Sequence, residues 1–186
     1  PIGFASQREL PKLHKTTLKR WSKKNLLNGS NEKKVYLLAD EFTNFNDVHI
    51  GIKAIELLVK LGYTVEIVDI LDTGRAYISK GLLKSAQRIA NGNVNKLKRL
   101  LSHDTPLVGI EPSALLTFRD EYPELVSIEN RATAIELSKY CLLFDEFFMR
   151  EVEKGFFKKE NFIAGELKIK LHGHCQQKAV ASTTPT

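Results

Sequence analysis

The sequence predicts an α/β fold, an open and mainly parallel sheet with helices on both faces. Two observations lead to this prediction. Short apolar runs of strand length alternate along the chain with longer segments whose apolar residues fall at helical spacing. The links between them are short, and strand–helix–strand units with short links usually form parallel strands joined by right-handed crossovers. We therefore expect four strands alternating with helices, and a further helix near the end of the chain.

The first strand is expected at VYLLA, residues 35–39, which is continuously apolar and of strand length. Residues 50–62 then carry apolar side chains on one helical face and end at Gly62, a common stop for a helix. The β-branched stretch YTVEIVDIL, residues 63–71, predicts the second strand.

The loop DTGRAYISKG, residues 72–81, follows the second strand. Ser79 is in position to cap the next helix, which we expect over residues 82–103. PLVGI, residues 106–110, predicts a third short buried strand. It leads into a helix that begins at EPSA, where the proline suits the first helical position.

The last third of the chain predicts a long helix and a final strand. Residues 131–155 read as one amphipathic helix, with Cys141 at an apolar position typical of a buried structural cysteine. ELKIKL, residues 166–171, alternates in polarity and predicts the fourth strand. HGHC then forms a turn, and the last helix begins with QQKAVAS.

Composition limits the class of protein. Two cysteines are too few for a disulfide framework, and no apolar run reaches the roughly 18 residues that a membrane span needs. The first residues also lack the pattern of a signal peptide. We therefore predict free thiols and a reducing compartment, the cytoplasm.

The net charge of +6 is uneven. Residues 1–34 hold nine Lys or Arg against two Asp or Glu, a net +7, so the remainder carries −1. The turn-rich stretch NGSNEKK at 28–34 predicts a boundary between a basic arm or linker, 1–34, and a domain, 35–186. Such an arm is either a solvated linker or a contact for nucleic-acid phosphates or anionic lipid.

Parallel α/β sheets bind ligands beyond the carboxyl ends of their strands, so the loops at that edge are candidates for chemistry. In the loop 72–81, small and basic residues at a helix start either cradle an anion or form a simple strand-to-helix turn; these are Gly74, Arg75, Ser79 and Lys80. Glu111 and Arg119 form an ion pair that holds a loop, or take part in acid–base chemistry.

The turn before the last helix carries three donors that suit a metal: His172, His174 and Cys175. A thiol at a helix N-terminus is favoured as the thiolate, which is the form that binds metals. The alternative is that Cys175 is a small core residue and that both histidines bond to the backbone.

Three strings carry a resemblance to a known family: GRAYISKGLL, VGIEPSALLTFRDEYPEL and LHGHCQQKA, in this order. Together they resemble the C-terminal cysteine-rich (CCG) domain of FAD-linked oxidases fused to iron–sulfur domains, of the D-lactate or D-2-hydroxyglutarate dehydrogenase type. Glycolate oxidase, in its iron–sulfur protein, and heterodisulfide reductase carry related modules. The resemblance implies a tandem of two α/β lobes. This chain is expected to hold the first lobe and the truncated start of the second.

The resemblance also implies a site. Cys175 matches the lone cysteine that opens the second lobe and binds an iron–sulfur cluster or another metal, with His172 and His174 as secondary candidates. The first lobe lacks the family's cysteines, since Asp72-Thr73-Gly74 stands where Cys-Cys-Gly is usual and Ala114 follows Glu-Pro-Ser. We therefore expect the first lobe to form a wall of the site, through Asp72, Thr73, Gly74, Arg75, Ser79, Lys80, Glu111 and Ser113. No catalytic residue is assigned.

The function that the resemblance implies is electron transfer. FAD on another domain of the parent protein would oxidise a 2-hydroxy acid such as lactate or glycolate, and iron–sulfur (4Fe-4S) centres would pass the electrons to an acceptor. The expected partners are the remaining domains of that protein, in the cytoplasm or peripheral to the inner face of the membrane, with no specific nucleic acid. The fragment alone is expected to be inactive. The alternative is an anion- or nucleic-acid-binding α/β module that uses the basic N-terminal arm.

Overall fold

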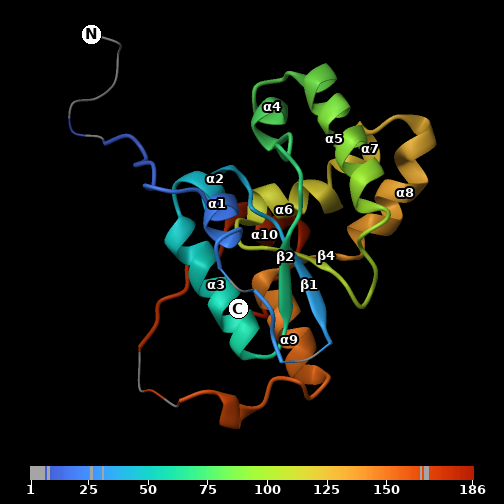
Figure 1. The fold of residues 1–186 in the computed structure, drawn as a ribbon. Helices are drawn as coiled ribbons and strands as arrows, with labels where there is room; N and C mark the ends of the chain where they lie inside the picture. Colours follow the sequence, from blue (N-terminus) through green and yellow to red (C-terminus); the bar gives the residue numbers. More distant parts are fainter. Residues whose placement is uncertain (1–6, 8, 26, 31, 164, 166–167) are drawn as a thin grey trace.

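Four parallel strands form a sheet at the centre of the chain, in the order β2-β1-β3-β4 (Figure 1). The structure is a computed structural model and describes residues 7, 9–25, 27–30, 32–163, 165 and 168–186. The strands are β1 (Lys34–Leu37), β2 (Thr64–Ile67), β3 (Leu107–Gly109) and β4 (Cys141–Leu143). The predicted α/β class with an open parallel sheet is confirmed.

The strand order reverses at β1. The chain runs from β1 to β2 on one side and then returns to β3 and β4 on the other. Tyr36 of β1 lies opposite Leu107 of β3, which in turn lies opposite Cys141 of β4. In sheets of this kind, such a reversal leaves a crevice beyond the carboxyl ends of the two central strands.

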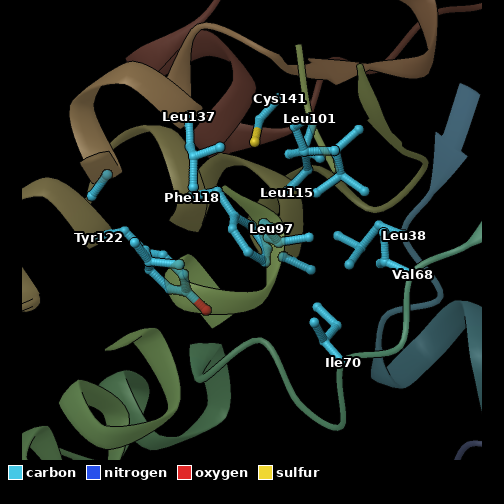
Figure 2. Packing of buried hydrophobic residues seen from close by; sticks show 14 of the residues in the cluster. Leu38, Val68, Ile70, Leu97, Leu101, Leu115, Phe118, Tyr122, Leu137 and Cys141 are labelled. Atoms are coloured by element: carbon cyan, nitrogen blue, oxygen red, sulfur yellow. The ribbon is translucent and has the colours of Figure 1, made fainter. Parts of the chain in front are cut away.

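Helices cover both faces of the sheet because its side chains alternate between two hydrophobic clusters. Val35 and Leu37 point into one cluster, and Tyr36 and Leu38 into the other. The first cluster is covered by α1 (Leu18–Ser22), α3 (Val48–Lys60) and α9 (Phe144–Glu153). The second, shown in Figure 2, is covered by α5 (Leu83–Leu97), α6 (Pro112–Arg119) and α8 (Ile128–Ser138).

Shorter helices complete the described chain. They are α2 (Glu41–Phe45), α4 (Arg75–Ser79), α7 (Tyr122–Leu125), a 3₁₀ turn (Lys159–Asn161) and α10 (Cys175–Val180). Of these, α2 follows β1, α4 follows β2, and α10 packs against α6. In the part of the chain that the structure describes, no helix has the length and apolar character required to span a membrane.

The fourth strand is not where the sequence predicted it. The expected helix at 131–155 is divided into α8, β4 and α9, so Cys141 is buried as expected but in a strand. A three-residue apolar run satisfies helical and extended periodicity equally well, and pairing with β3 decides between them. In the expected strand at 166–171, residues 168–171 are irregular and Ile169 is 82% exposed, while 166 and 167 lie outside the described residues.

The described part of the predicted basic arm packs against the domain. Leu18 of α1 is fully buried among the residues of the first cluster. The Lys19 backbone N–H donates to Asn44 Oδ1 at 3.1 Å, and its Nζ donates to the Ile70 carbonyl oxygen. Desolvation on burial lowers the pKa of Lys19. Lys19 is therefore part of the packed structure, and the boundary at residue 34 stays a prediction.

Candidate functional site

A cavity of about 450 Å³ opens at the carboxyl edge of the sheet, where the strand order reverses. Its walls come from the segments that follow β1, β2 and β3 and from α10; they are Glu41, Phe42, Arg75, Ala76, Ser79, Glu111, Ser113, Ala114 and Gln176. Ligands of parallel α/β proteins usually bind at this point, and the volume suits a small metabolite. This cavity is the candidate functional site.

Asp40 closes the loop after β1 by capping α2. Its Oδ1 accepts hydrogen bonds from the backbone N–H groups of Phe42 at 2.9 Å and Thr43 at 3.0 Å, and Thr43 Oγ1 donates to its Oδ2. Only 2% of Asp40 is exposed, and desolvation on burial raises the pKa of its carboxyl group. A helix-capping carboxylate therefore stands near the position where the resembling family carries a first-lobe cysteine.

Glu41 joins the loop after β1 to the turn after β2. Its Oε1 accepts hydrogen bonds from the Thr73 backbone N–H at 2.8 Å and from Thr73 Oγ1 at 3.0 Å. Desolvation on burial raises the pKa of Glu41, and the neighbouring Asp72 raises it further. Asp72 Oδ1 accepts the N–H of Gly74 at 2.6 Å, and Gly74 has a positive φ of 79° that favours glycine.

The Asp72-Thr73-Gly74 turn is also held from behind. Tyr122 Oη donates to the Thr73 carbonyl oxygen at 2.9 Å, and Asn93 Nδ2 donates to the Asp72 carbonyl oxygen at 2.9 Å and to Tyr122 Oη at 2.8 Å. Asn93 and Tyr122 are both buried. The turn therefore has its backbone groups bonded on both sides, which makes it a rigid wall of the cavity.

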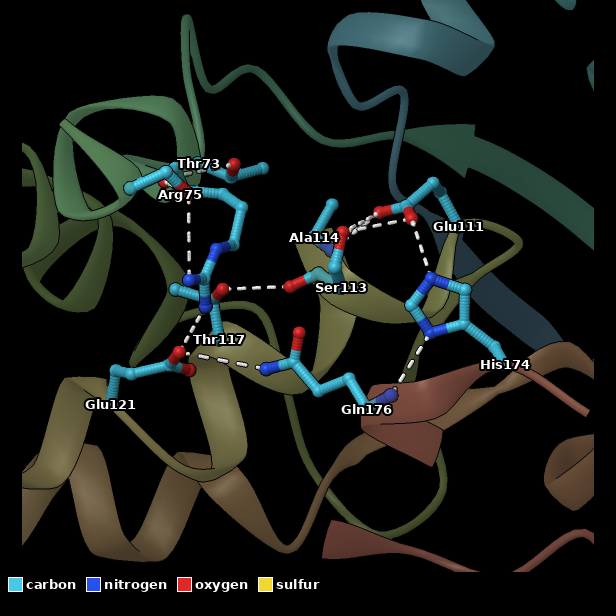
Figure 3. Close-up of polar contacts among 10 residues, drawn as sticks. Thr73, Arg75, Glu111, Ser113, Ala114, Thr117, Glu121, His174 and Gln176 are labelled. Atoms are coloured by element: carbon cyan, nitrogen blue, oxygen red, sulfur yellow. Dashed lines mark hydrogen bonds and ion pairs between the residues drawn. The ribbon is translucent and has the colours of Figure 1, made fainter. Parts of the chain in front are cut away.

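Arg75 and Ser79 face the cavity from α4, but neither acts as the sequence predicted. The Arg75 guanidinium pairs with Glu121 (Figure 3). Ser79 does not cap the following helix, which begins after Leu82; its Oγ donates to the Arg75 carbonyl oxygen at 3.1 Å instead. Lys80 is exposed and does not line the cavity.

Glu111 caps α6 at the end of the loop after β3. Its carboxylate accepts hydrogen bonds from the Ala114 N–H at 2.5 Å and from Ser113 Oγ at 2.8 Å. The expected pair with Arg119 is wrong, because Arg119 lies at the other end of α6, about 12 Å along the helix axis. Arg119 pairs instead with Glu146 of α9 at 2.6 Å.

The candidate metal ligands lie at the start of α10. Cys175 is exposed and is the first residue of this helix. His174 caps the helix, since its Nδ1 accepts the Gln176 N–H at 3.2 Å. That bond places the ring proton on Nε2, which lies 3.9 Å from Glu111 Oε1. His172 is exposed.

These residues do not by themselves fit an iron–sulfur cluster. In the described ranges, no three or more His, Cys, Asp or Glu side chains are grouped so that they could hold a metal ion. Burial raises the pKa of the Cys141 thiol to about 12, so this second cysteine is protonated at neutral pH and closed off in the core. Metal binding by Cys175 stays a prediction.

A second cavity, of about 350 Å³, lies at the opposite edge of the sheet, where the strands begin. Its base is the buried Glu151, which accepts a hydrogen bond from Tyr63 and pairs with Arg150 at 3.0 Å and Lys154 at 3.5 Å. These charges satisfy one another and tie α9 to the start of β2. We assign this cavity to structure and the one at the carboxyl edge to function.

The structure brings several residues of the predicted site wall together and leaves others behind or outside it. Arg75, Ser79, Glu111 and Ser113 line the cavity, while the turn 72–74 forms its support. Sequence reasoning did not include four lining residues in the site: Glu41, Phe42, Ala76 and Gln176. Glu41 and Phe42 had a usable signal, because they directly follow the first strand. Gln176 had none, because its place depends on how α10 packs against α6.

About half of the chain is similar to a short part of D-2-hydroxyglutarate dehydrogenases. The enzyme of that name from Pantoea ananatis is 33% identical over 93 residues, which are 50% of this chain and 9% of the relative. Those from Haemophilus influenzae and Escherichia coli are 30% identical over 48% and 47% of this chain, and again 9% of each relative. No family model and no solved structure matches the chain. The matches support a relationship to the D-2-hydroxyglutarate dehydrogenase family.

Proposed function

We propose that this chain is an electron-transfer module of a flavin-dependent 2-hydroxy-acid oxidoreductase of the D-2-hydroxyglutarate dehydrogenase type. The observation that carries the proposal is the 33% identity to such an enzyme over half of the chain. Because the matched part is 9% of that enzyme, oxidation of the hydroxy acid belongs to other parts of the parent protein. This chain contributes to the parent's redox centre and does not oxidise substrate alone.

In this proposal Cys175 supplies one ligand of an iron–sulfur cluster, and the other ligands come from outside this chain. The thiol is exposed at the N-terminus of α10, where the helix dipole favours a thiolate. The next residue, Gln176, lines the cavity at the carboxyl edge of the sheet. The first lobe then serves as a wall, because carboxylates and an alanine stand where the family has cysteines.

The test uses a longer polypeptide that continues past Thr186 through the next expected Cys-Cys-Gly segment. Purified without oxygen, it should contain iron and sulfide and absorb visible light. Cys175→Ala should lower the iron content and the absorbance, while Cys141→Ala should leave both unchanged because its thiol is buried in β4. Circular dichroism confirms that both variants fold.

Two results would count against the proposal. A colourless, metal-free longer polypeptide would remove the electron-transfer role. An iron content that is unaffected by Cys175→Ala would leave the role intact but remove Cys175 from the ligand set.

A further inference from the structure

The cavity at the carboxyl edge of the sheet is surrounded by helix N-termini whose N–H groups are already bonded within the chain. Asp40 accepts from the first turn of α2, Glu111 from that of α6, and His174 from that of α10. Asp72 and Thr73 accept from the N–H groups of Gly74 and Arg75 at the start of α4. An anionic ligand would therefore have to displace one of these acceptors.

The charges around the cavity are mainly negative. Glu41 and Glu111 line it directly. Arg75, the single cation among its described lining residues, is paired with Glu121. The other oxygen of Glu121, Oε2, is buried and has no hydrogen-bond partner among the described residues. The site therefore holds more acceptors than donors, and His174 is the nearest further group that can carry a positive charge.

The rest of the wall is apolar or small. Phe42 is 52% exposed although it lines the cavity, so its ring offers a surface that a bound molecule can cover. Ala76 and Ala114 complete this side. A volume of about 450 Å³ accommodates a ligand that combines a polar head with a short hydrocarbon part.

We propose that this cavity binds a small organic cation, with an alkylammonium or alkylguanidinium head between Glu41 and Glu111 and its hydrocarbon part on Phe42, Ala76 and Ala114. A cation replaces the solvation that a buried carboxylate has lost, so it stabilises the charged form. The raised pKa of Glu41 agrees with this, since burial has made its charged form less stable. This binding is separate from the proposed function, which concerns Cys175.

Two sources offer the same chemistry: a free amine or guanidine, and a lysine or arginine side chain from another domain of the parent protein. Two probes separate them. The first is n-butylguanidinium, and the second is N-acetylarginine amide, which resembles a side chain in a polypeptide. Tighter binding of the second probe would indicate a side chain as the source, and tighter binding of the first a free ligand.

The experiment is a titration of the ¹⁵N-labelled chain followed by NMR, with butyrate and phosphate as anionic probes at equal ionic strength. The cation should shift the amide signals of Phe42, Ala76 and Ala114 in a saturable way. Glu41→Gln keeps an oxygen for Thr73 and removes the charge, so it should raise the Kd about tenfold, equivalent to about 1.4 kcal/mol. Glu124→Gln is the matched control, because Glu124 is exposed and pairs with Arg131 at 2.5 Å.

Glu111→Gln is the second variant and should weaken the cation similarly. Because Glu111 also caps α6, its unfolding midpoint is measured alongside, and Glu41→Gln decides the result if the cap variant is unstable. The proposal is overturned if the cation causes no saturable shift at millimolar concentration, or if butyrate or phosphate binds the same amides as tightly. It is also overturned if Glu124→Gln weakens binding as much as Glu41→Gln does.

Discussion

Leu18 decides whether the basic N-terminal segment belongs to the core of the domain or is a linker. Its side chain is fully buried in the cluster that contains Val35 and Leu37. It also lies directly against α3, since a Cβ added to Gly51 would come within 2.5 Å of Leu18 Cδ2. Leu18 therefore occupies a space that exists because position 51 has no side chain.

Leu18→Ala is expected to lower the free energy of unfolding by about 3 kcal/mol. Truncation of a buried leucine costs about 2–5 kcal/mol, because the transfer energy is lost and a cavity remains. We take the middle of this range because Leu18 lies between a short helix and a long one, and the short α1 can move to fill part of the cavity. For a chain of 186 residues, this loss corresponds to a Tm lower by about 6–12 °C.

Urea denaturation followed by circular dichroism measures the change. The control is Leu13→Ala in the same segment, where Leu13 is 79% exposed and truncation should change stability by less than about 0.5 kcal/mol. Equal stability of the two variants would refute the reasoning. The segment would then be a linker, as the charge pattern suggested.

The remaining predictions concern the cap of α2, the two thiols and the end of β3. Asp40→Ala should cost about 1–2 kcal/mol in a urea melt, whereas Asp40→Asn keeps the capping oxygen and should cost much less. Burial raises the pKa of Asp40, so the charged form is penalised above that pKa; the stability of Asp40→Asn relative to the native chain should fall on acidification through it, and a constant difference would contradict this. Ellman's reagent should label Cys175 at once and Cys141 only after unfolding, because burial raises the pKa of Cys141 to about 12; two fast thiols would contradict this burial. Gly109→Ala should cost about 1–3 kcal/mol because its Cβ would lie 2.8 Å from Leu115, and an unchanged urea midpoint would show that α6 can shift.

Local pattern was enough to predict the first half of the fold. The apolar run at 35–39 and the β-branched run at 63–71 contain most of β1 and all of β2, and the helix between them ends near Gly62 as expected. Each of these elements has its own periodicity and its own stop signal. Residues 141–143 have neither, because three apolar residues fit a helix and a strand equally well.

The candidate site could be predicted in part for the same reason. The rule that ligands bind beyond the carboxyl ends of parallel strands pointed to the loops that contain Arg75, Ser79, Glu111 and Ser113, and all four line the cavity. The partners of these residues could not be predicted. Arg75 pairs with Glu121, 46 residues further along the chain, and such a contact leaves no local trace in the sequence.

The sequence by itself determined the α/β class, the parallel direction of the strands and the loops that form the site, because these depend on local periodicity and on short connections. Tertiary structure decided the rest. Pairing with β3 made a strand of residues 141–143, and the packing of Leu18 joined the N-terminal segment to the core. Burial also decided the roles of the carboxylates, since the same acidic side chains would be solvated and uncoupled in an unfolded chain but cap helices and line one cavity here.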